Sequence, residues 1–309
     1  MGAQQRIFRQ QIKDTQSTKK ITRAMELIAS SRIVKAQAAV RANQPYARAL
    51  YEALTLAASH ARISHPLLSE VENPKRAAIL LITADRGLAG AYSSNAIKEG
   101  ERLASRLKER GLSPAWYVVG RKGVGFFKFR ERPVADSWAG FSDSPSYDDA
   151  KEIASRLLED FKSDGPEGVD EIHIVYTHFV NRVTQEPRVL RVVPLEIVDE
   201  VVDTESGSGI HGAEEKGGTA VWPLYDFEPD AETTLDHLLP RLVEHLVHVS
   251  LLQSAASEHA ARQRAMKSAT DNAEDLIRRY TRQANQARQA EITQEISEIV
   301  GGADALASS

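Results

Sequence analysis

The sequence contains no cysteine among its 309 residues, and this absence excludes several kinds of chemistry. A disulfide framework, a thiolate zinc site, a cysteine nucleophile and a thiol redox switch all require that residue. Aromatic residues make up only 6 %, which is low for a surface that stacks nucleotides. Apolar runs such as Ala77–Ile82 fall far short of the roughly 18 residues of a membrane span. The net charge of −4 argues against a protein that is basic overall and binds nucleic acid.

Glycine and proline are rare near the N-terminus, where the pattern predicts a long helix. Residues 5–60 contain Pro45 as their only proline and no glycine. Small and apolar residues recur there at spacings of three and four, in a main row of Ala24, Leu27, Ser31, Val34 and Ala38 and a neighbouring row of Ile21, Met25 and Ile28. A narrow stripe with a period near 3.5 is typical of a coiled-coil helix, and we expect this one to form the buried seam.

A second long helix is predicted near the C-terminus. Residues 231–300 contain Pro240 as their only proline and no glycine, and Gly301-Gly302 is expected to end the helix. The predicted seam consists of Leu235, Leu239, Leu242, Leu246 and Val249, and further on Ala269, Ala273, Leu276, Tyr280, Gln283 and Ala287. The stretch 253–270 is mostly small or polar and so should be weakly held by itself. The two helices, residues 1–60 and 230–300, are expected to pair antiparallel; the alternative is that each packs separately on a large partner.

Strand and helix patterns alternate over residues 75–200. Strands are predicted at 76–83, 115–119, 171–176 and, as an edge strand, 187–198, and helices at 89–110, 122–130 and 147–162, the last with Ser146 as its N-cap. Residues 199–219, rich in glycine and glutamate, are predicted to be a flexible acidic loop. The predicted fold is therefore α/β plus long helices: an antiparallel coiled coil of the N- and C-terminal helices with a central open, mostly parallel, Rossmann-like α/β domain.

Charge is unevenly distributed along the chain. Residues 1–60 carry ten lysines or arginines against three acidic residues, a net charge of +7, whereas residues 198–232 carry ten acidic residues and one lysine. The basic helix suits an anionic partner, which could be a nucleic acid, an acidic protein loop or a lipid surface. The alternative is that these charges are the solvated faces of a long helix.

The residues offer little sign of bond-making chemistry. The loop Asp85–Gly90 lies where a phosphate-binding loop would lie, but neither it nor Gly120–Gly125 matches a known phosphate-binding pattern, so both are predicted to be structural turns. His245 and His248 lie three apart on a helix, but no third metal ligand stands at a useful spacing. We therefore expect no catalytic residues, no cofactor and no metal.

The two ends resemble a known family. The run Lys20–Ser31, which reads KITRAMELIASS, and the loop Asp85–Tyr92, which reads DRGLAGAY, are similar to the corresponding segments of γ subunits of F-type ATP synthases. The C-terminal runs 257–273 and 285–296 are similar as well, in the right order. The resemblance covers nearly the whole chain and is weaker over 111–170 and 199–220.

The resemblance implies a bacterial rotor shaft that carries no reacting groups. In that family the paired terminal helices run through a hexamer of α and β subunits, and the α/β domain forms a foot on the ε subunit and the c-ring of the membrane sector. Contacts with the catch-loop region of the β subunit are expected from Arg288, Gln289, Thr293 and Glu295. Contacts with the lever region of the β subunit are expected from Lys20, Arg23 and Met25. Contacts with the ε subunit or the c-ring are expected from Arg86, Tyr92, Tyr225 and Glu228.

Two other functions stay open from the sequence. One is a nucleotide-binding α/β protein, and the other is a coiled-coil protein that binds nucleic acid through residues 1–60. The resemblance instead predicts partners that are proteins, with no nucleic acid and no direct insertion into lipid. It also predicts a peripheral position at the cytoplasmic face of the bacterial cell membrane, because no transit peptide precedes the first motif.

Overall fold

The computed structural model describes residues 3–60, 65–163, 165–195 and 230–307. Its elements are α1 (Ala3–His60), β1 (Arg76–Ile82), α2 (Tyr92–Glu109), β2 (Ser113–Val119), α3 (Arg121–Phe129), β3 (Asp136–Trp138), α4 (Tyr147–Phe161), β4 (Glu171–Phe179), β5 (Gln185–Val193) and α5 (Ala231–Ala307). They divide into two compact units, one of residues 1–29 with 263–309 and one of residues 30–262. Both long helices contribute to both units.

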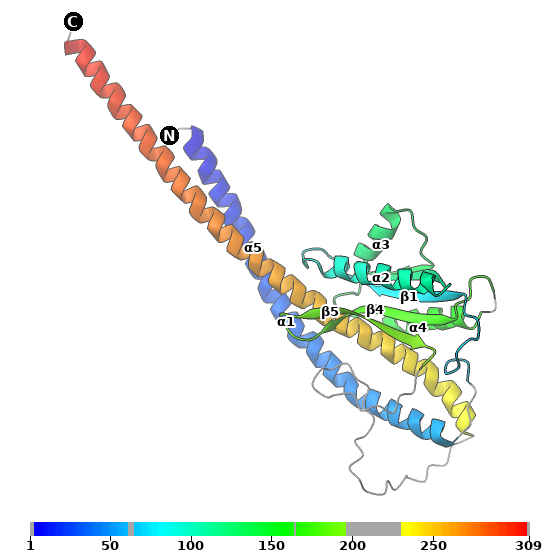
Figure 1. The fold of residues 1–309 in the computed structure, drawn as a ribbon. Helices are drawn as coiled ribbons and strands as arrows, with labels where there is room; N and C mark the ends of the chain where they lie inside the picture. Colours follow the sequence, from blue (N-terminus) through cyan, green and yellow to red (C-terminus); the bar gives the residue numbers. More distant parts are fainter. Residues whose placement is uncertain (1–2, 61–64, 164, 196–229, 308–309) are drawn as a thin grey trace. The chain divides into compact units, whose positions relative to one another are not determined.

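In the first unit, α1 and the C-terminal part of α5 run antiparallel (Figure 1). The hydroxyl groups of Thr22 and Thr270 lie 2.8 Å apart, and Lys19 Nζ lies 3.2 Å from Glu274 Oε2. Moving towards the N-terminus of α1 thus corresponds to moving towards the C-terminus of α5, so the two helices are antiparallel. The predicted pairing of the two ends is confirmed.

The buried seam of α1 differs from the predicted one. Between residues 20 and 35 its buried positions are Thr22, Glu26, Ala29 and Ile33, spaced four, three and four apart, so the coiled-coil period is correct but the phase is wrong. The predicted rows face outward instead, with Ile21, Leu27, Ile28 and Val34 each more than half exposed. A prediction from hydrophobicity alone places the wrong face of α1 in the seam. This pair of helices buries small and hydroxyl-bearing side chains and leaves larger apolar ones uncovered.

In the second unit, the predicted aliphatic seam of α5 is buried at Leu235, Leu239 and Leu242 and half-buried at Leu246 and Val249. Leu235, Leu239 and Leu242 pack in one core with Leu50 and Leu54 of α1. Val243, Val247 and Leu251 belong to the same core and are also buried, so more than one face of α5 is covered here. This part of α5 contacts both α1 and the α/β layer, and therefore shows a broader apolar face than a two-helix seam requires.

The sheet has the strand order β3-β2-β1-β4-β5. The pairs β1–β2, β1–β4 and β2–β3 are parallel, and only β5 runs antiparallel, paired with β4 along the edge. This confirms the open, mostly parallel sheet with residues 187–193 in an edge strand. Ala77–Ile82 is fully buried, because the central strand β1 is covered on both of its faces.

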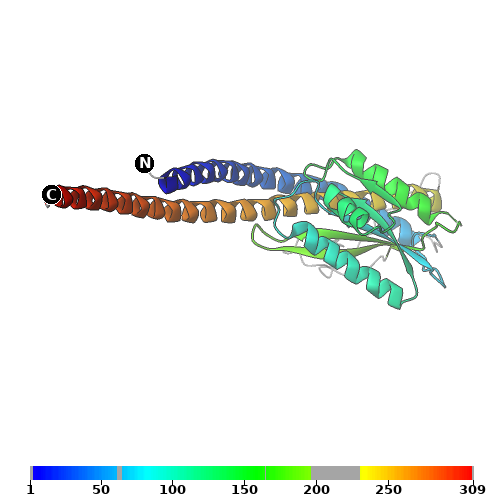
Figure 2. The same cartoon turned by 90° about the horizontal axis from the view of Figure 1, so that it is seen from above.

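Successive residues of β1 point to opposite faces of the sheet and join two separate cores. Ala78, Leu80 and Ile82 pack with α4 and with the long helices, whereas Ile79 and Leu81 pack with α2 and α3. Figure 2 shows α2 and α4 on opposite sides of the sheet. The layers therefore follow the helix–sheet–helix arrangement expected of this strand order.

One strand and two helix ends depart from the sequence expectation. The short strand β3 was not predicted, because three residues are too few to show an alternating pattern. Helix α2 begins at Tyr92 rather than at residue 89, because Leu88 and Gly90 adopt positive φ values of 63° and 56°. Helix α5 continues through Gly301-Gly302 to Ala307. Glycine can adopt helical backbone angles as readily as the left-handed ones that end a helix, so the predicted stop is wrong. Ser146 caps α4 as predicted.

Candidate functional site

The ends of β1 and β4 meet helix α5, and this helix–sheet joint is the candidate functional site. In open α/β sheets, ligands bind at the carboxyl ends of the strands. Here residues 253–262 of α5 occupy that edge and are buried throughout (Figure 1). The stretch 253–270 was expected to be weakly held by itself; within it, the small and polar side chains of 253–262 are buried against the sheet.

Backbone groups at the end of β4 bond directly to α5. The amide of Thr177 donates to Ser254 Oγ at 3.2 Å, and Ser257 Oγ donates to the carbonyl of Thr177 at 2.9 Å. The amide of Phe179 donates to Gln253 Oε1 at 3.1 Å. Hydroxyl and amide side chains on one face of α5 thus satisfy groups that the sheet leaves unpaired at this point.

A buried ion pair lies beside these contacts. Glu258 is fully buried, and its Oε1 accepts a hydrogen bond of 2.6 Å from Arg262 Nη2. The same guanidinium lies 3.4 Å from the carbonyl of Arg86 and 3.3 Å from that of Gly87, in the loop after β1. Burial raises the pKa of Glu258, against the opposing effect of Arg262. The pair therefore links α5 to the Asp85–Gly90 loop.

The loop at residues 139–143, which we call the clasp loop, completes the joint. Asp85 accepts hydrogen bonds from the amides of Gly140 and Ser142, at 2.8 and 3.0 Å. Ser142 Oγ donates to Glu258 Oε2 at 3.0 Å. Burial opposes ionisation of Asp85, but the backbone donors outweigh it and lower the pKa of that carboxyl. The loop after β1 is thus fastened to the clasp loop and, through Ser142, to α5.

Tyr92, expected to contact a partner, lies inside this joint and is only 5 % exposed. Burial raises the pKa of its hydroxyl, which interacts with Ser254 and Thr177. Its position gives it a packing role within the chain. Arg86 is exposed beside it, whereas Tyr225, Glu228 and the acidic loop at 199–219 lie outside the described residues.

The expected contact residues on the long helices lie on the surface of the first unit. Lys20 and Arg23 are exposed, Met25 is half-buried, and Arg23 pairs with Glu26 at 2.8 Å. Arg288, Gln289, Thr293 and Glu295 are all exposed. The antiparallel register places the first residues of α1 level with about residue 289 of α5, so the C-terminal group extends past the helix pair (Figure 1).

The histidine pair on α5 is part of an aromatic cluster. The His245 ring lies 5.3 Å from that of Tyr46, and the His248 ring lies 5.5 Å from that of Tyr147. Tyr147 OH donates to Glu244 Oε2 at 2.6 Å. Among the described residues, no group of three or more His, Asp or Glu side chains is arranged to hold a metal ion. The cluster joins α1, α4 and α5 by packing.

The titration of His245 yields a testable pH dependence. Burial, and then the charge of His248, lower the pKa of His245 from 6.5 to about 4. Below pH 6.5 the unfolded chain binds a proton that the folded chain excludes, so stability is lost as the pH falls towards 4. At about 1.4 kcal/mol per pKa unit the loss reaches about 3 kcal/mol. Between pH 7.5 and 4.5, the free energy of unfolding measured in urea should fall less steeply with pH for His245→Phe than for wild type. Equal pH dependence in the two proteins would contradict the lowered pKa of His245.

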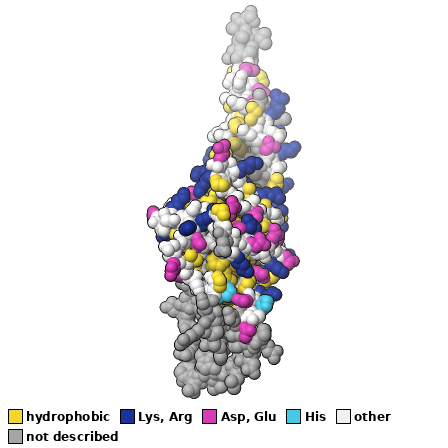
Figure 3. All heavy atoms as spheres, turned by 90° about the vertical axis from the view of Figure 1, so that its right-hand side faces the viewer, with side chains coloured by type: hydrophobic (Ala, Val, Ile, Leu, Met, Phe, Trp, Pro, Cys, Tyr) yellow, Lys and Arg dark blue, Asp and Glu magenta, His cyan; other side chains and the backbone are white. Residues whose placement is uncertain are grey.

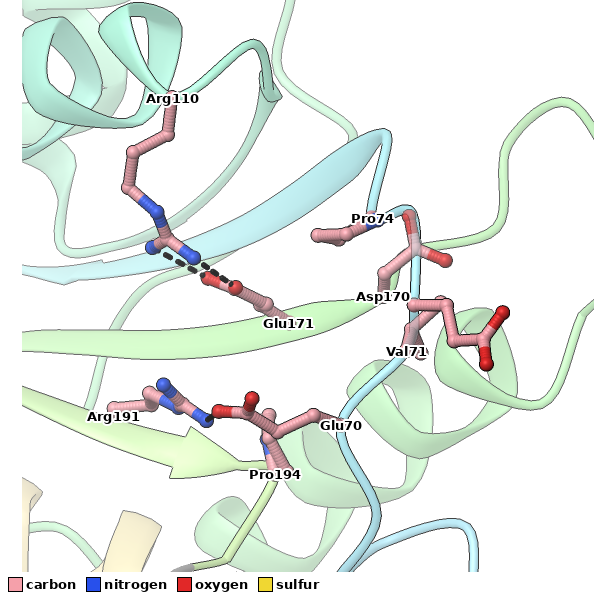
Figure 4. A pocket seen from close by; sticks show the side chains of 9 residues that line it. Glu70, Val71, Pro74, Arg110, Asp170, Glu171, Arg191 and Pro194 are labelled. Atoms are coloured by element: carbon pink, nitrogen blue, oxygen red, sulfur yellow. Dashed lines mark hydrogen bonds and ion pairs between the residues drawn. The ribbon is translucent and has the colours of Figure 1, made fainter.

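A polar hollow of about 240 Å³ lies at the opposite end of the sheet, where β1 and β4 begin (Figure 4). Arg110 binds Glu171 through two hydrogen bonds of 2.6 and 3.2 Å, and Arg191 Nη2 lies 2.8 Å from Glu70 Oε1. Burial by itself would raise the pKa of Glu171, but hydrogen bonds with Arg110 and His173 outweigh burial and lower that pKa. Carboxylates of the chain itself pair with both arginines, so we interpret the hollow as lined by an internal ion-pair network.

Charges of both signs are interspersed on the face shown in Figure 3. Many of the basic side chains have an acidic neighbour; for example, Arg132 pairs with Glu101 and Arg156 pairs with Asp160. Mixed charge is the ordinary condition of a protein surface and differs from the clustered positive charge that nucleic acid binding requires.

Comparison with known proteins decides the family. The family model described as ATP synthase matches residues 4–306. A curated ATP synthase gamma chain from Kineococcus radiotolerans is 59 % identical over 310 residues, covering 100 % of this chain and 99 % of that one. The chain belongs to the ATP synthase gamma chain family. The gamma chain of Thermobifida fusca is 56 % identical, with 99 % of this chain and 98 % of that one covered.

A solved structure of an ATP synthase contains a chain with a similar fold. The rotor of the mitochondrial ATP synthase of Euglena gracilis includes a chain that is 17 % identical, with a TM-score of 0.62 over 94 % of this chain and 100 % of that one. At this identity the likeness shows the fold alone. Along the described residues, no helix combines the length and the apolar character that crossing a membrane requires.

The sequence points to only part of the joint, namely Tyr92 and the Asp85–Gly90 loop. The segment Ser257–Arg262 contributes there only to the family resemblance, and Ser142 and Asp143 belong to no motif. One signal was present: a run of small and polar residues inside a long helix is unusual, and it indicates a close or hydrogen-bonded approach by another element. The clasp loop itself carries no comparable signal.

Proposed function

We propose that this chain is the central rotor shaft of a proton-translocating ATP synthase. It transmits torque between the c-ring of the membrane sector and a hexamer of α and β subunits, and so regulates the nucleotide sites of that hexamer. The observation that carries the proposal is the outward apolar face of the paired helices, on which Ile21 is 61 % and Ile28 is 55 % exposed. Apolar side chains held outward on a two-helix unit favour a surrounding protein partner.

The mechanism follows from asymmetry. A pair of helices inside a ring of three similar catalytic sites presents a different face to each of them. Each site then makes different contacts, and its affinity for nucleotide differs accordingly. By linkage, binding and release of nucleotide act back on the shaft with the same coupling free energy. The chain needs no reacting group for this role.

The proposed contacts divide along the helices. Lys20, Arg23 and Met25 are assigned to the lever region of the β subunit, because cations on an exposed helix face suit acidic loops. Arg288, Gln289, Thr293 and Glu295 are assigned to the catch-loop region. Ile292, Ile296 and Ile299, spaced four and three apart and exposed, lie among them and supply apolar area to the same contact. Arg86 is assigned to the ε subunit or the c-ring, and the chain to the cytoplasmic face of the bacterial cell membrane.

Reconstitution with the α and β subunits tests the function. Alone, the chain should hydrolyse no ATP. Added to the two partners, it should produce cooperative hydrolysis together with rotation of a probe fixed to the α/β domain. Hydrolysis without rotation would overturn the proposal. Equilibrium dialysis with ATP tests the nucleotide-binding alternative, which requires tight binding by the isolated chain.

Replacing Arg288 and Gln289 together with alanine should weaken the hold of the hexamer on the shaft by about tenfold, because a buried arginine at an interface commonly contributes more than 1.4 kcal/mol. Both residues are exposed in the chain itself, so its circular dichroism and melting temperature should not change. Stall torque and the fraction of assembled complex measure the effect. The control replaces Arg48 and Glu52, an exposed pair on α1. Equal torque in the two variants would contradict the contact.

A further inference from the structure

The clasp loop bonds to both long helices within the second unit. The Asp143 carboxylate forms an ion pair with Arg32 of α1, and its carbonyl lies 2.9 Å from His259 Nε2 of α5. Ser142 Oγ bonds Glu258 of α5. Arg86 lies 3.7 Å from the same Asp143 carboxylate. Two adjacent residues therefore join α1, α5 and the loop after β1.

These contacts, like the bonds between the end of β4 and α5, differ in kind from the apolar part of the helix–sheet packing. The core around Leu50, Leu54 and Leu235 is apolar, and apolar burial is non-directional. Such a core resists separation of the layers, but a small sliding movement changes its buried area little. Hydrogen bonds and ion pairs weaken steeply as angle and distance change. The clasp loop therefore supplies a directional restraint against rotation of the helix pair relative to the sheet.

The clasp loop is itself firmly held. Its amides at Gly140 and Ser142 bond to one oxygen of Asp85, and the other oxygen of Asp85 accepts from the amide of Arg121, at 3.1 Å. The loop follows β3, whose last residue accepts a hydrogen bond of 2.8 Å from Gly120 at the end of β2. A force applied at Asp143 is thus carried into the sheet by several hydrogen bonds.

We propose that Ser142 and Asp143 act as a clasp that fixes the rotational position of the α/β domain on the two long helices, so that torque enters the shaft through them. The inference rests on the proposed function as a rotor. Asp143 is a positioning residue in this scheme: it touches no nucleotide, and its effect is on how stiffly the α/β domain follows the helices.

The test measures torsional stiffness in the complex of this chain with the α and β subunits. The chain has no cysteine, so Phe129→Cys, at a site 88 % exposed, gives one labelling position on the α/β domain. With the hexamer fixed and ATP turnover paused, the angular variance of a bead on that cysteine reports the stiffness. Asp143→Ala should raise the angular variance at least twofold. The rate of ATP hydrolysis should stay within twofold of that of the complex that carries Phe129→Cys alone.

Further variants separate a clasp from a general loss of structure. Asp143→Glu keeps the carboxylate and should restore most of the stiffness, whereas Asp143→Asn, nearly the same size, should not. Arg32→Ala should raise the variance as well, and joining it to Asp143→Ala should add little, because both substitutions remove the same Arg32–Asp143 ion pair. Glu52→Ala, which breaks an exposed ion pair on α1, serves as the control and should change nothing.

The outcomes distinguish the two proposals. Unchanged variance in both Asp143→Ala and Asp143→Asn, in complexes that rotate, overturns the clasp and leaves the shaft in place. Failure of the wild-type chain to drive any rotation overturns the shaft. If Asp143→Ala does not assemble, Asp143→Asn against Asp143→Glu decides the question, because these two differ in charge and reach but not in the loop backbone.

Discussion

Replacing Glu258 with alanine is expected to lower the free energy of unfolding by about 3–5 kcal/mol, the usual effect of removing one partner of a buried ion pair. The carboxylate is fully buried and is bonded to both Arg262 and Ser142. Without it, the guanidinium keeps only the two long contacts to the carbonyls of Arg86 and Gly87. A buried positive charge then lacks its partner, and the Ser142 hydroxyl loses its acceptor. Urea unfolding at pH 7.5 measures the loss.

Two further variants make this expectation specific. Glu258→Gln keeps the shape of the side chain and an acceptor for Ser142, so its loss should be smaller than that of the alanine variant. Glu52→Ala breaks the exposed pair with Arg48 and should change stability by less than about 0.5 kcal/mol. An alanine variant at 258 as stable as wild type would show that the ion pair does not hold the joint together.

Much of the fold could be predicted because its signals are local. The apolar run in β1, the Ser146 cap and the absence of glycine over residues 5–60 each depend on neighbouring residues alone. Buried parallel strands need a continuous apolar sequence, so the centre of the sheet was the easiest part to recognise. A strand of three residues and a helix end at glycine carry too little local information.

The phase of α1 could not be predicted for a different reason. Sequence reasoning assigns the most apolar row of a helix to the inside, which assumes that the chain covers its own apolar surface. In this family the assumption fails, because an apolar face held outward is available to other subunits. Thr22 and Thr270 can lie inside because they bond each other, and that pairing is visible only once two distant segments are brought together.

The candidate site was hidden for the same reason. Most of its bonds join residues far apart in the sequence, such as Ser142 with Glu258, which are 116 positions apart. A serine in a short loop has no distinguishing pattern, and a glutamate in a long helix looks like a surface charge. The helix–sheet joint is therefore a property of the tertiary structure, whereas the contacts proposed for the long helices rest on sequence motifs.

Gly120 is the position at which a single methyl group is expected to be most damaging to the sheet. Its φ of 94° lies in the left-handed region, which costs other residues about 1–3 kcal/mol. A Cβ atom there would lie 2.3 Å from the carbonyl oxygen of Thr83, a backbone atom that cannot rotate away. Overpacking adds about 1–3 kcal/mol. Gly120→Ala should therefore lower the free energy of unfolding by roughly 2–6 kcal/mol.

Gly125 provides the matched control, because it lies in α3 with open space around it. Gly125→Ala should raise stability by about 0.5–1 kcal/mol, since alanine loses less backbone freedom than glycine in a helix. Urea unfolding of the two variants should therefore show opposite changes in the free energy of unfolding, although the same substitution is made only five residues away. Equal effects would show that backbone geometry at Gly120 is not the cause. Opposite effects would identify Gly120 as a requirement of the turn between β2 and α3, with no phosphate needed to explain it.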